Sequence, residues 1–176
     1  LNLDPAKIII WGRSLGSGPS SYMAEKLSKS GQPPAGLVLQ SPPMSIFRVA
    51  FDFRFTLPWD MFPNVDRLPN VKCRVFLIHG TRDEIVPFFN GEGLFFATPP
   101  ALRHKPLWIT NGGHNNLETI VDSEGTGDLI TPAFVDFLTV CSDGRYIPLE
   151  GAVKSKEEVK KKRSTWGSLF GKSDRA

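Results

Sequence analysis

Four short hydrophobic segments, rich in leucine and β-branched residues, alternate along the chain with segments of helical periodicity. Short apolar runs of this kind are typical of strands buried on both faces of a parallel sheet. The expected strands lie at 7–11, 37–39, 74–79 and 107–110. The expected helices lie at 19–28, 88–97, 115–122 and 131–140. Strands that alternate with helices predict an α/β fold, in which helices flank a parallel sheet.

The charges divide the chain into two unlike parts. Residues 1–150 carry 13 Lys and Arg against 15 Asp and Glu, whereas residues 151–176 carry 8 against 3. We therefore expect a globular domain over 1–150 and a basic, disordered tail over 151–176. Because the excess of cations lies in the tail, nucleic-acid binding by the globular part is disfavoured.

The two cysteines and three histidines narrow the chemistry further. Two cysteines are too few for a disulfide scaffold, which favours a reducing, intracellular compartment. The histidines stand in three separate sequence contexts, so they predict no metal site, and we expect no cofactor. No apolar run reaches the roughly 18 residues of a membrane-spanning helix.

Ser14 lies in the sequence Gly12-Arg13-Ser14-Leu15-Gly16, which matches the pattern Gly-x-Ser-x-Gly. The pentapeptide follows an expected buried strand and opens an expected helix, as a nucleophile elbow requires. Glycines at both ends would remove side chains that collide at so tight a turn. The helix start favours negative charge, and the backbone N–H of Leu15 could donate to an oxyanion. The alternative is a glycine-rich turn without catalysis, or a phosphate cradle.

A serine nucleophile needs a base, and the base needs an acid that orients it. His79 ends an expected strand, and His104 lies in a charged connection that we expect to be solvated. His114 is the better base, because it follows the fourth expected strand, where α/β sites lie. Asp83, directly after the third expected strand, is the candidate acid, with Glu84 as the alternative.

The three candidates follow separate strand ends in the chain order Ser14, Asp83, His114. This is the order of nucleophile, acid and base in α/β-hydrolases. Taken singly, His114 could be a helix-start residue and Asp83 part of a surface turn. Their joint placement favours serine hydrolase chemistry over those readings.

Several stretches resemble the α/β-hydrolase superfamily and, within it, the α/β-hydrolase domain-containing protein 17 family. They lie at 11–19, 39–42, 48–51, 60–66, 79–84 and 112–115. The elbow and histidine motifs occur throughout the superfamily, whereas the stretches at 48–51 and 62–66 are more specific. The resemblance covers about residues 5–140.

Members of that family are serine hydrolases that remove palmitoyl groups from cysteines of membrane-associated proteins. The resemblance therefore implies Ser14 as nucleophile, Asp83 as acid and His114 as base of an acyl-enzyme cycle. It also implies S-acylated, membrane-associated proteins as substrates, and the cytoplasmic face of membranes as the location.

The family's earlier strands have no counterpart in this sequence, and neither does its cysteine-rich, lipidated N-terminal segment. We therefore expect the C-terminal half of the hydrolase fold, with about four strands and the N-terminal strands missing. The first strand would then be an exposed apolar edge. The missing part includes the loop of the second oxyanion donor, whose loss lowers turnover roughly 100- to 1,000-fold.

The connection at 40–70 is rich in proline and aromatic residues. Phe51 and Phe55 could line a groove for an acyl chain beside Ser14, because pockets for apolar ligands are lined in this way. The same residues could equally pack as core.

The tail places four cations at 160–163 ahead of Trp166, Leu169 and Phe170, whose spacing fits one helical face. Cations beside an aromatic patch suit an anionic membrane surface. The alternative is a solvated tail without a partner.

Together these features favour a serine hydrolase of ester or thioester bonds, with palmitoyl-protein thioesterase as the leading activity. Two alternatives stay open. One is a peptidase similar to serine aminopeptidases, which share these motifs. The other is a non-catalytic fragment that lacks the oxyanion loop.

Overall fold

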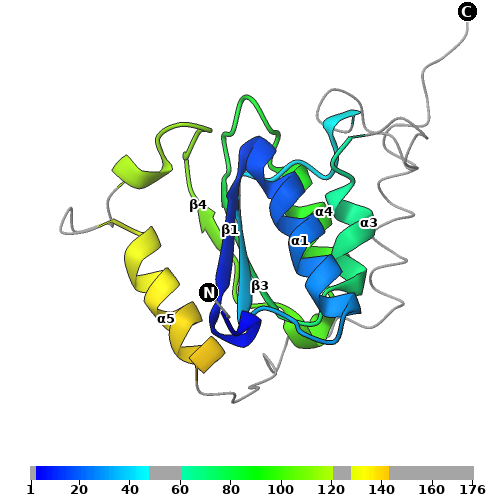
Figure 1. Ribbon diagram of the computed structural model, residues 1–176. Coiled ribbons are helices and arrows are strands. Elements are labelled where there is room, and N and C mark those ends of the chain that lie inside the picture. Colours follow the sequence, from blue (N-terminus) through cyan, green and yellow to red (C-terminus); the bar gives the residue numbers. More distant parts are fainter. Residues whose placement is uncertain (1–2, 48–60, 121–127, 143–176) are drawn as a thin grey trace, which may run out of the picture. The chain divides into compact units, whose positions relative to one another are not determined.

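A computed structural model describes residues 3–47, 61–120 and 128–142 (Figure 1). In these residues one parallel sheet has the strand order β1-β2-β3-β4. Its strands are Ile9–Arg13 (β1), Gly36–Gln40 (β2), Arg74–Gly80 (β3) and Leu107–Ile109 (β4). Each strand overlaps one of the four expected strands. The parallel pairing confirms the predicted α/β class.

Helices cover both faces of this sheet. They are α1 (Ser17–Lys29), α3 (Asn64–Arg67), α4 (Phe89–Ala97) and α5 (Ile130–Ser142). Helices α1, α3 and α4 lie on one face and α5 on the other (Figure 1). The helices expected at 19–28, 88–97 and 131–140 are therefore confirmed.

The helix expected at 115–122 is wrong over 115–120, and its last two residues lie outside the described residues. The structure has only the 3-10 turn Leu117–Thr119 (η5) there. Both the N–H and the hydroxyl of Thr119 bond to the Asn116 carbonyl, and Ile120 is already extended, so no second turn forms among the described residues.

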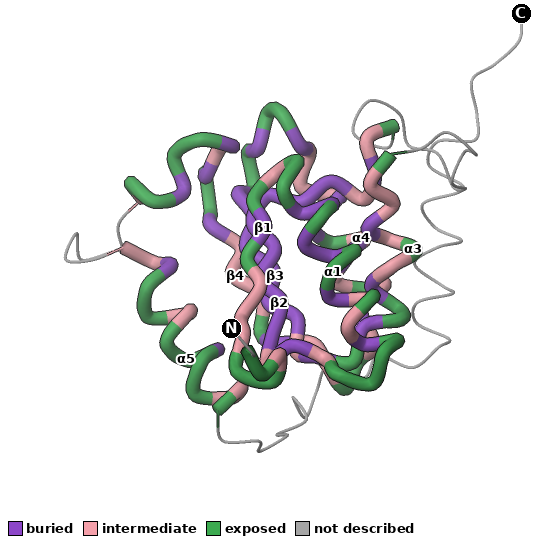
Figure 2. The backbone as a smooth tube through the Cα atoms, in the orientation of Figure 1, coloured by how far each residue is buried: buried purple, intermediate pink, exposed green. Residues whose placement is uncertain are grey.

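Two hydrophobic clusters fill the spaces between the sheet and its helices. Leu37, Leu39 and Leu77 face α1 and α4 in one cluster, whereas Val38, Phe76 and Ile78 pack with α5 in the other. The central strands β2 and β3 are therefore buried on both faces (Figure 2). Burial of each such Leu or Phe side chain contributes roughly 1.5–3 kcal/mol.

Strand β1 pairs only with β2 among the described residues and forms one edge of the sheet. Trp11 is 40% exposed and packs edge-on against Phe134 of α5, with the ring centroids 4.8 Å apart. The predicted burial of 7–11 on both faces is therefore wrong, since Lys7 and Trp11 are exposed and the residues between them are only partly buried, whereas the predicted apolar edge is confirmed.

The expected solvation of His104 is also wrong. Its ring is 8% exposed and lies between Phe76 and Phe137, with centroids 5.1 and 5.2 Å away. Burial lowers the pKa of His104, and Arg74 and Lys105 act in the same direction, while the Asp136 carboxylate, 3.3 Å from Nε2, raises it.

The described helices and strands all lie in one compact unit of the chain. The chain divides into two compact units, Leu1–Tyr146 and Ile147–Ala176, and all described elements belong to the first. The groove candidates Phe51 and Phe55 and the basic tail lie outside the described residues. Among the helices that are described, none is both long and apolar enough to cross a membrane.

Candidate active site

Ser14 lies at a sharp turn directly between β1 and α1. Its φ of 48° is in the left-handed region, which non-glycine residues rarely adopt and which costs of order 1–3 kcal/mol. A Cβ on Gly12 would lie 2.6 Å from the Gly16 carbonyl oxygen and 2.8 Å from Ser17 Cα. Only glycine therefore fits at Gly12, as predicted.

The same steric prediction is wrong at Gly16. A Cβ there would meet nothing within 4 Å, and the backbone φ of −62° is ordinary helix. Gly16 caps the start of α1 without being crowded, so the second glycine of the pentapeptide has no steric role in this structure.

The structure brings together the three side chains that the sequence singled out. Ser14 Oγ lies 2.9 Å from His114 Nε2. His114 Nδ1 lies 2.8 Å from Asp83 Oδ2 and 3.0 Å from Oδ1. They come from separate strand ends, after β1, β3 and β4, because all strands of the parallel sheet end at the same edge.

Asp83 is built into its turn as a charged acceptor. Its side chain is fully buried, and Oδ1 accepts the backbone N–H groups of Ile85 and Val86 at 3.0 and 2.7 Å. Burial alone raises the pKa of this carboxyl, but hydrogen bonds from His79, Val86, His114 and Ile85 together lower it well below its usual range. Asp83 is therefore ionised at neutral pH and holds the proton of His114 on Nδ1.

Hydrogen bonds also join the loops that carry the acid and the base. The N–H of Arg82 donates to the Gly112 carbonyl at 2.9 Å. Glu84, the alternative acid, accepts the backbone N–H of His114 at 3.3 Å and does not contact its ring. The structure therefore places Asp83, and not Glu84, on the imidazole.

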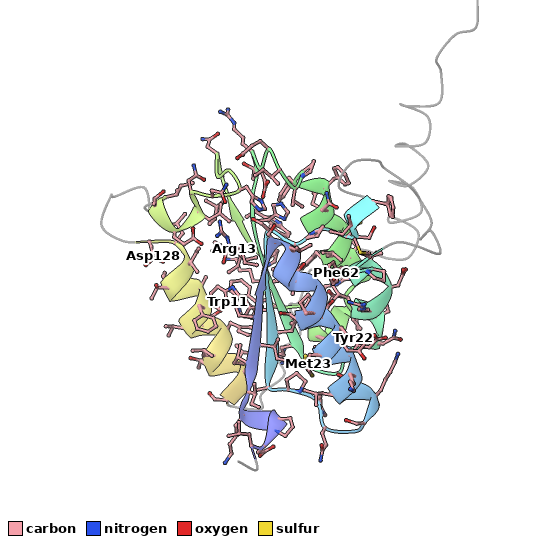
Figure 3. The ribbon with its side chains drawn as sticks, turned by 45° about the horizontal axis from the view of Figure 1, so that its top comes forward. Trp11, Arg13, Tyr22, Met23, Phe62 and Asp128 are labelled. Carbon is pink, nitrogen blue, oxygen red and sulfur yellow. The ribbon has the colours of Figure 1, made fainter. Side chains whose placement is uncertain are left out.

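Arg13 ties β1 to the loop of the base. Its Nη2 donates to the carbonyl oxygen of His114 and to Asn115 Oδ1, each at 3.0 Å. Figure 3 shows Arg13 at the end of β1, two residues beyond Trp11 on the same strand. Sequence reasoning missed this contact, because Arg13 occupies a variable position of the motif and its partner is 101 residues away.

The buried side-chain amide of Asn64 holds the start of α1, directly after the turn that carries Ser14. Asn64, the first residue of α3, is fully buried. Its Nδ2 donates to Ser17 Oγ and to the Pro43 carbonyl, each at 2.9 Å, and its Oδ1 accepts the hydroxyl of Ser21. Asn64 thus holds the first two turns of α1 against the loop after β2. The sequence offered no sign of this network.

Leu15 lies within the 3-10 turn Ser14–Gly16 (η2), which leads into α1. The first N–H groups of a helix lack intrahelical partners and can donate to an oxyanion. The Leu15 side chain is more than half exposed, so the peptide lies near the surface. Its part as an oxyanion donor stays a prediction.

The described residues offer neither a reactive thiolate nor a cluster of metal ligands. Burial raises the pKa of Cys73 to about 12 and that of Cys141 to about 11, so neither is a thiolate nucleophile near neutral pH. In the part of the chain that the structure describes, no three His, Cys, Asp or Glu side chains gather as metal ligands would.

Comparisons with known proteins show sequence relatives and a shared fold, although no protein-family model matches the chain. The α/β-hydrolase domain-containing protein aho-3 of Caenorhabditis elegans is 40% identical over 114 residues, 64% of this chain and 32% of the worm protein. The human α/β-hydrolase domain-containing protein 17C is 38% identical over 117 residues, 66% of this chain and 33% of that protein. The chain spans about a third of the length of these relatives.

Solved structures share the fold. A bacterial membrane phospholipase A superposes with a TM-score of 0.54 at 14% identity, over 79% of this chain and 59% of the other. This likeness shows the arrangement of strands and helices and nothing finer. With the sequence relatives it leads to one conclusion: the chain has the fold of the α/β-hydrolases and is similar in sequence to the α/β-hydrolase domain-containing protein 17 proteins.

Proposed function

We propose that this protein is a serine hydrolase that cleaves ester and thioester bonds through an acyl-enzyme intermediate. The observation that carries the proposal is the continuous hydrogen-bond chain from Ser14 through His114 to Asp83. Since Asp83 holds the Nδ1 proton, Nε2 of neutral His114 accepts the Ser14 hydroxyl and can take its proton.

The first half of the cycle forms the acyl-enzyme. Ser14 Oγ attacks the acyl carbon while His114 Nε2 takes the hydroxyl proton. The bond from the acyl carbon to sulfur or oxygen then breaks, and His114 returns the proton to the leaving group. The buried Asp83 carboxylate stabilises the transient imidazolium throughout.

The second half releases the acid. His114 takes a proton from water, whose oxygen attacks the acyl-Ser14 carbonyl. The ester bond to Ser14 breaks, the fatty acid leaves, and the proton returns to Ser14. The Leu15 N–H is the proposed donor to the oxyanion in both halves, and one such donor is worth roughly 100- to 1,000-fold in turnover.

We propose S-palmitoylated, membrane-associated proteins as the substrate class. Similarity to the domain-containing 17 proteins supports this choice. The chemistry supports it too, since a thiolate with a pKa near 8.5 leaves more readily than an amine and demands less of the oxyanion site. The basic tail would attract the enzyme to anionic lipids on the cytoplasmic face.

The test compares two substrates that differ in one bond. A palmitoyl-thioester peptide and the matching palmitoyl-amide peptide are incubated with the purified chain, with Ser14→Ala and with Ser30→Ala. Ser30 is an exposed serine at the far end of α1, so it controls for the substitution itself. We expect thioester cleavage that falls at least ~1,000-fold in Ser14→Ala and is unchanged in Ser30→Ala.

Two results would contradict the proposal. Comparable cleavage of the amide would indicate a peptidase instead. A folded wild-type chain that cleaves neither substrate would indicate a protein without hydrolase activity.

A further inference from the structure

His79 is a fully buried histidine that the proposed acyl transfer does not use. It lies in β3, four residues before Asp83. Its Nε2 lies 2.8 Å from the Val86 carbonyl oxygen and 3.4 Å from Asp83 Oδ2. The ring therefore contacts both the proposed acid and the turn that carries it.

The hydrogen-bond partners of His79 assign its proton. A carbonyl oxygen and a carboxylate only accept, so Nε2 is the protonated nitrogen and donates toward both. Nδ1 is buried without a hydrogen-bond partner among the described residues. A proton there would be a buried donor with no acceptor, which is unfavourable, so the ring is the neutral Nε2–H tautomer.

The ring of His79 is also held in place. Phe88 contacts it edge-to-face with the centroids 5.8 Å apart. Helix α4 approaches from the same side so closely that a Cβ on Gly91 would lie 2.6 Å from Nδ1. The imidazole cannot tilt without moving α4, and Nε2 is a fixed donor.

Two hydrogen bonds of the Val86 backbone hold the turn from Asp83 to Val86. The N–H of Val86 donates to Asp83 Oδ1 at 2.7 Å, while its carbonyl accepts from His79. We propose that His79 is a positioning residue, which fixes the Asp83 carboxylate and, through it, the imidazole of His114. This inference rests on the proposed serine hydrolase function.

A core histidine of purely structural importance would behave differently. Its loss would lower the melting temperature without changing the reactivity of Ser14 in the molecules that stay folded. A positioning residue changes that reactivity, because a displacement of ~1 Å in a reactive group lowers rates by about 100-fold. The rate of a reaction at Ser14 therefore separates the two roles.

The experiment measures covalent labelling of Ser14 by a fluorophosphonate in the full chain. The saturating rate and the half-saturating probe concentration are determined for wild type, His79→Asn and His79→Gln. The amide nitrogen of Gln reaches about as far as Nε2 and can replace the donor, whereas that of Asn stops near Nδ1. Thermal unfolding shows which fraction of each variant is folded at the labelling temperature.

We expect His79→Asn to lower the saturating rate about 10- to 100-fold, with little change in the half-saturating concentration. We expect His79→Gln to recover most of the rate. In an Asp83→Ala background, His79→Asn should have almost no further effect, since its action passes through Asp83.

Wild-type labelling rates in folded His79→Asn would overturn the positioning role, and so would a full additional loss on top of Asp83→Ala. Failure of the folded wild-type chain to label at Ser14 would instead overturn the proposed function, and this inference with it. Nitrogen NMR of the wild-type His79 ring tests the assignment even where a variant does not fold. An Nδ1–H tautomer would overturn it.

Discussion

We expect Gly12→Ala and Gly16→Ala to change the stability of the protein in opposite directions, although the motif requires glycine at both positions. At Gly12 a Cβ would lie 2.5 Å from Ser20 Oγ, 2.6 Å from the Gly16 carbonyl oxygen and 2.8 Å from Ser17 Cα. The hydroxyl can rotate, but the other two atoms are backbone. Gly12→Ala must therefore push α1 away from β1, and overpacking of this kind destabilises by about 1–3 kcal/mol.

At Gly16 the added methyl group meets open space on helical backbone. Gly16→Ala should therefore stabilise the protein by about 0.5–1 kcal/mol, chiefly by restricting the unfolded chain. For a chain of this size, 2 kcal/mol corresponds to roughly 4–8 °C in melting temperature. We expect Gly12→Ala to melt lower by about that amount and Gly16→Ala to melt slightly higher than wild type.

Circular dichroism melting curves and Ser14 labelling rates of the two variants test this contrast. Displacement of the elbow in Gly12→Ala should also slow labelling by roughly 100-fold, whereas Gly16→Ala should label at the wild-type rate. Equal melting temperatures in the two variants would refute the reasoning from backbone contacts. So would a loss of labelling confined to Gly16→Ala.

Three further changes probe other parts of the site and core. Arg13→Met removes both hydrogen bonds to the loop of His114 and should slow Ser14 labelling several-fold at unchanged melting temperature, with partial recovery in Arg13→Lys; an unchanged rate would show that the loop is held without it. Asn64→Leu takes the hydrogen-bond donor away from Ser17 Oγ and the Pro43 carbonyl, whereas the Ser21 hydroxyl keeps its bond to the Gly18 carbonyl. At about 1 kcal/mol or more for each buried group left unpaired, we expect a destabilisation of about 2 kcal/mol or more in urea unfolding, and a loss below about 1 kcal/mol would contradict this network. The pKa of His104 is lower in the folded chain than the 6.5 of an unperturbed histidine, so the unfolded chain takes up this proton first on acidification. The free energy of unfolding therefore decreases as the pH falls below 6.5. The drop in melting temperature from pH 7.5 to 5.5 should therefore be smaller in His104→Gln than in wild type, and an equal drop would contradict the burial of this ring.

The hydrophobic pattern predicted the four strands because each is short, apolar and bounded by turn residues. In a parallel sheet all strands end at one edge, so side chains just after strand ends converge. That rule, applied to the sequence alone, was sufficient to place Ser14, Asp83 and His114 at one site, where their hydrogen bonds now join them.

The sequence did not reveal the surroundings of His104 and His79 or the end of the turn near residue 119, because each depends on contacts or backbone geometry that the pattern of residues does not encode. The burial of His104 depends on Phe76 and Phe137, which come from separate elements, so its charged sequence neighbours misled the prediction. The contact of His79 with the acid depends on a turn geometry that composition does not reveal. The expected helix at 115–122 had the right periodicity, but a single 3-10 turn closed it after Thr119.

The most direct test of the central claim asks whether His114 activates Ser14. The purified chain and His114→Gln are treated with a fluorophosphonate, and the modified peptide is identified by mass spectrometry. We expect a single adduct on Ser14 in the wild type and labelling slower by at least ~1,000-fold in a folded His114→Gln variant, since a serine without its base is a poor nucleophile. An adduct on another residue, or equal labelling of the two proteins, would contradict the claim.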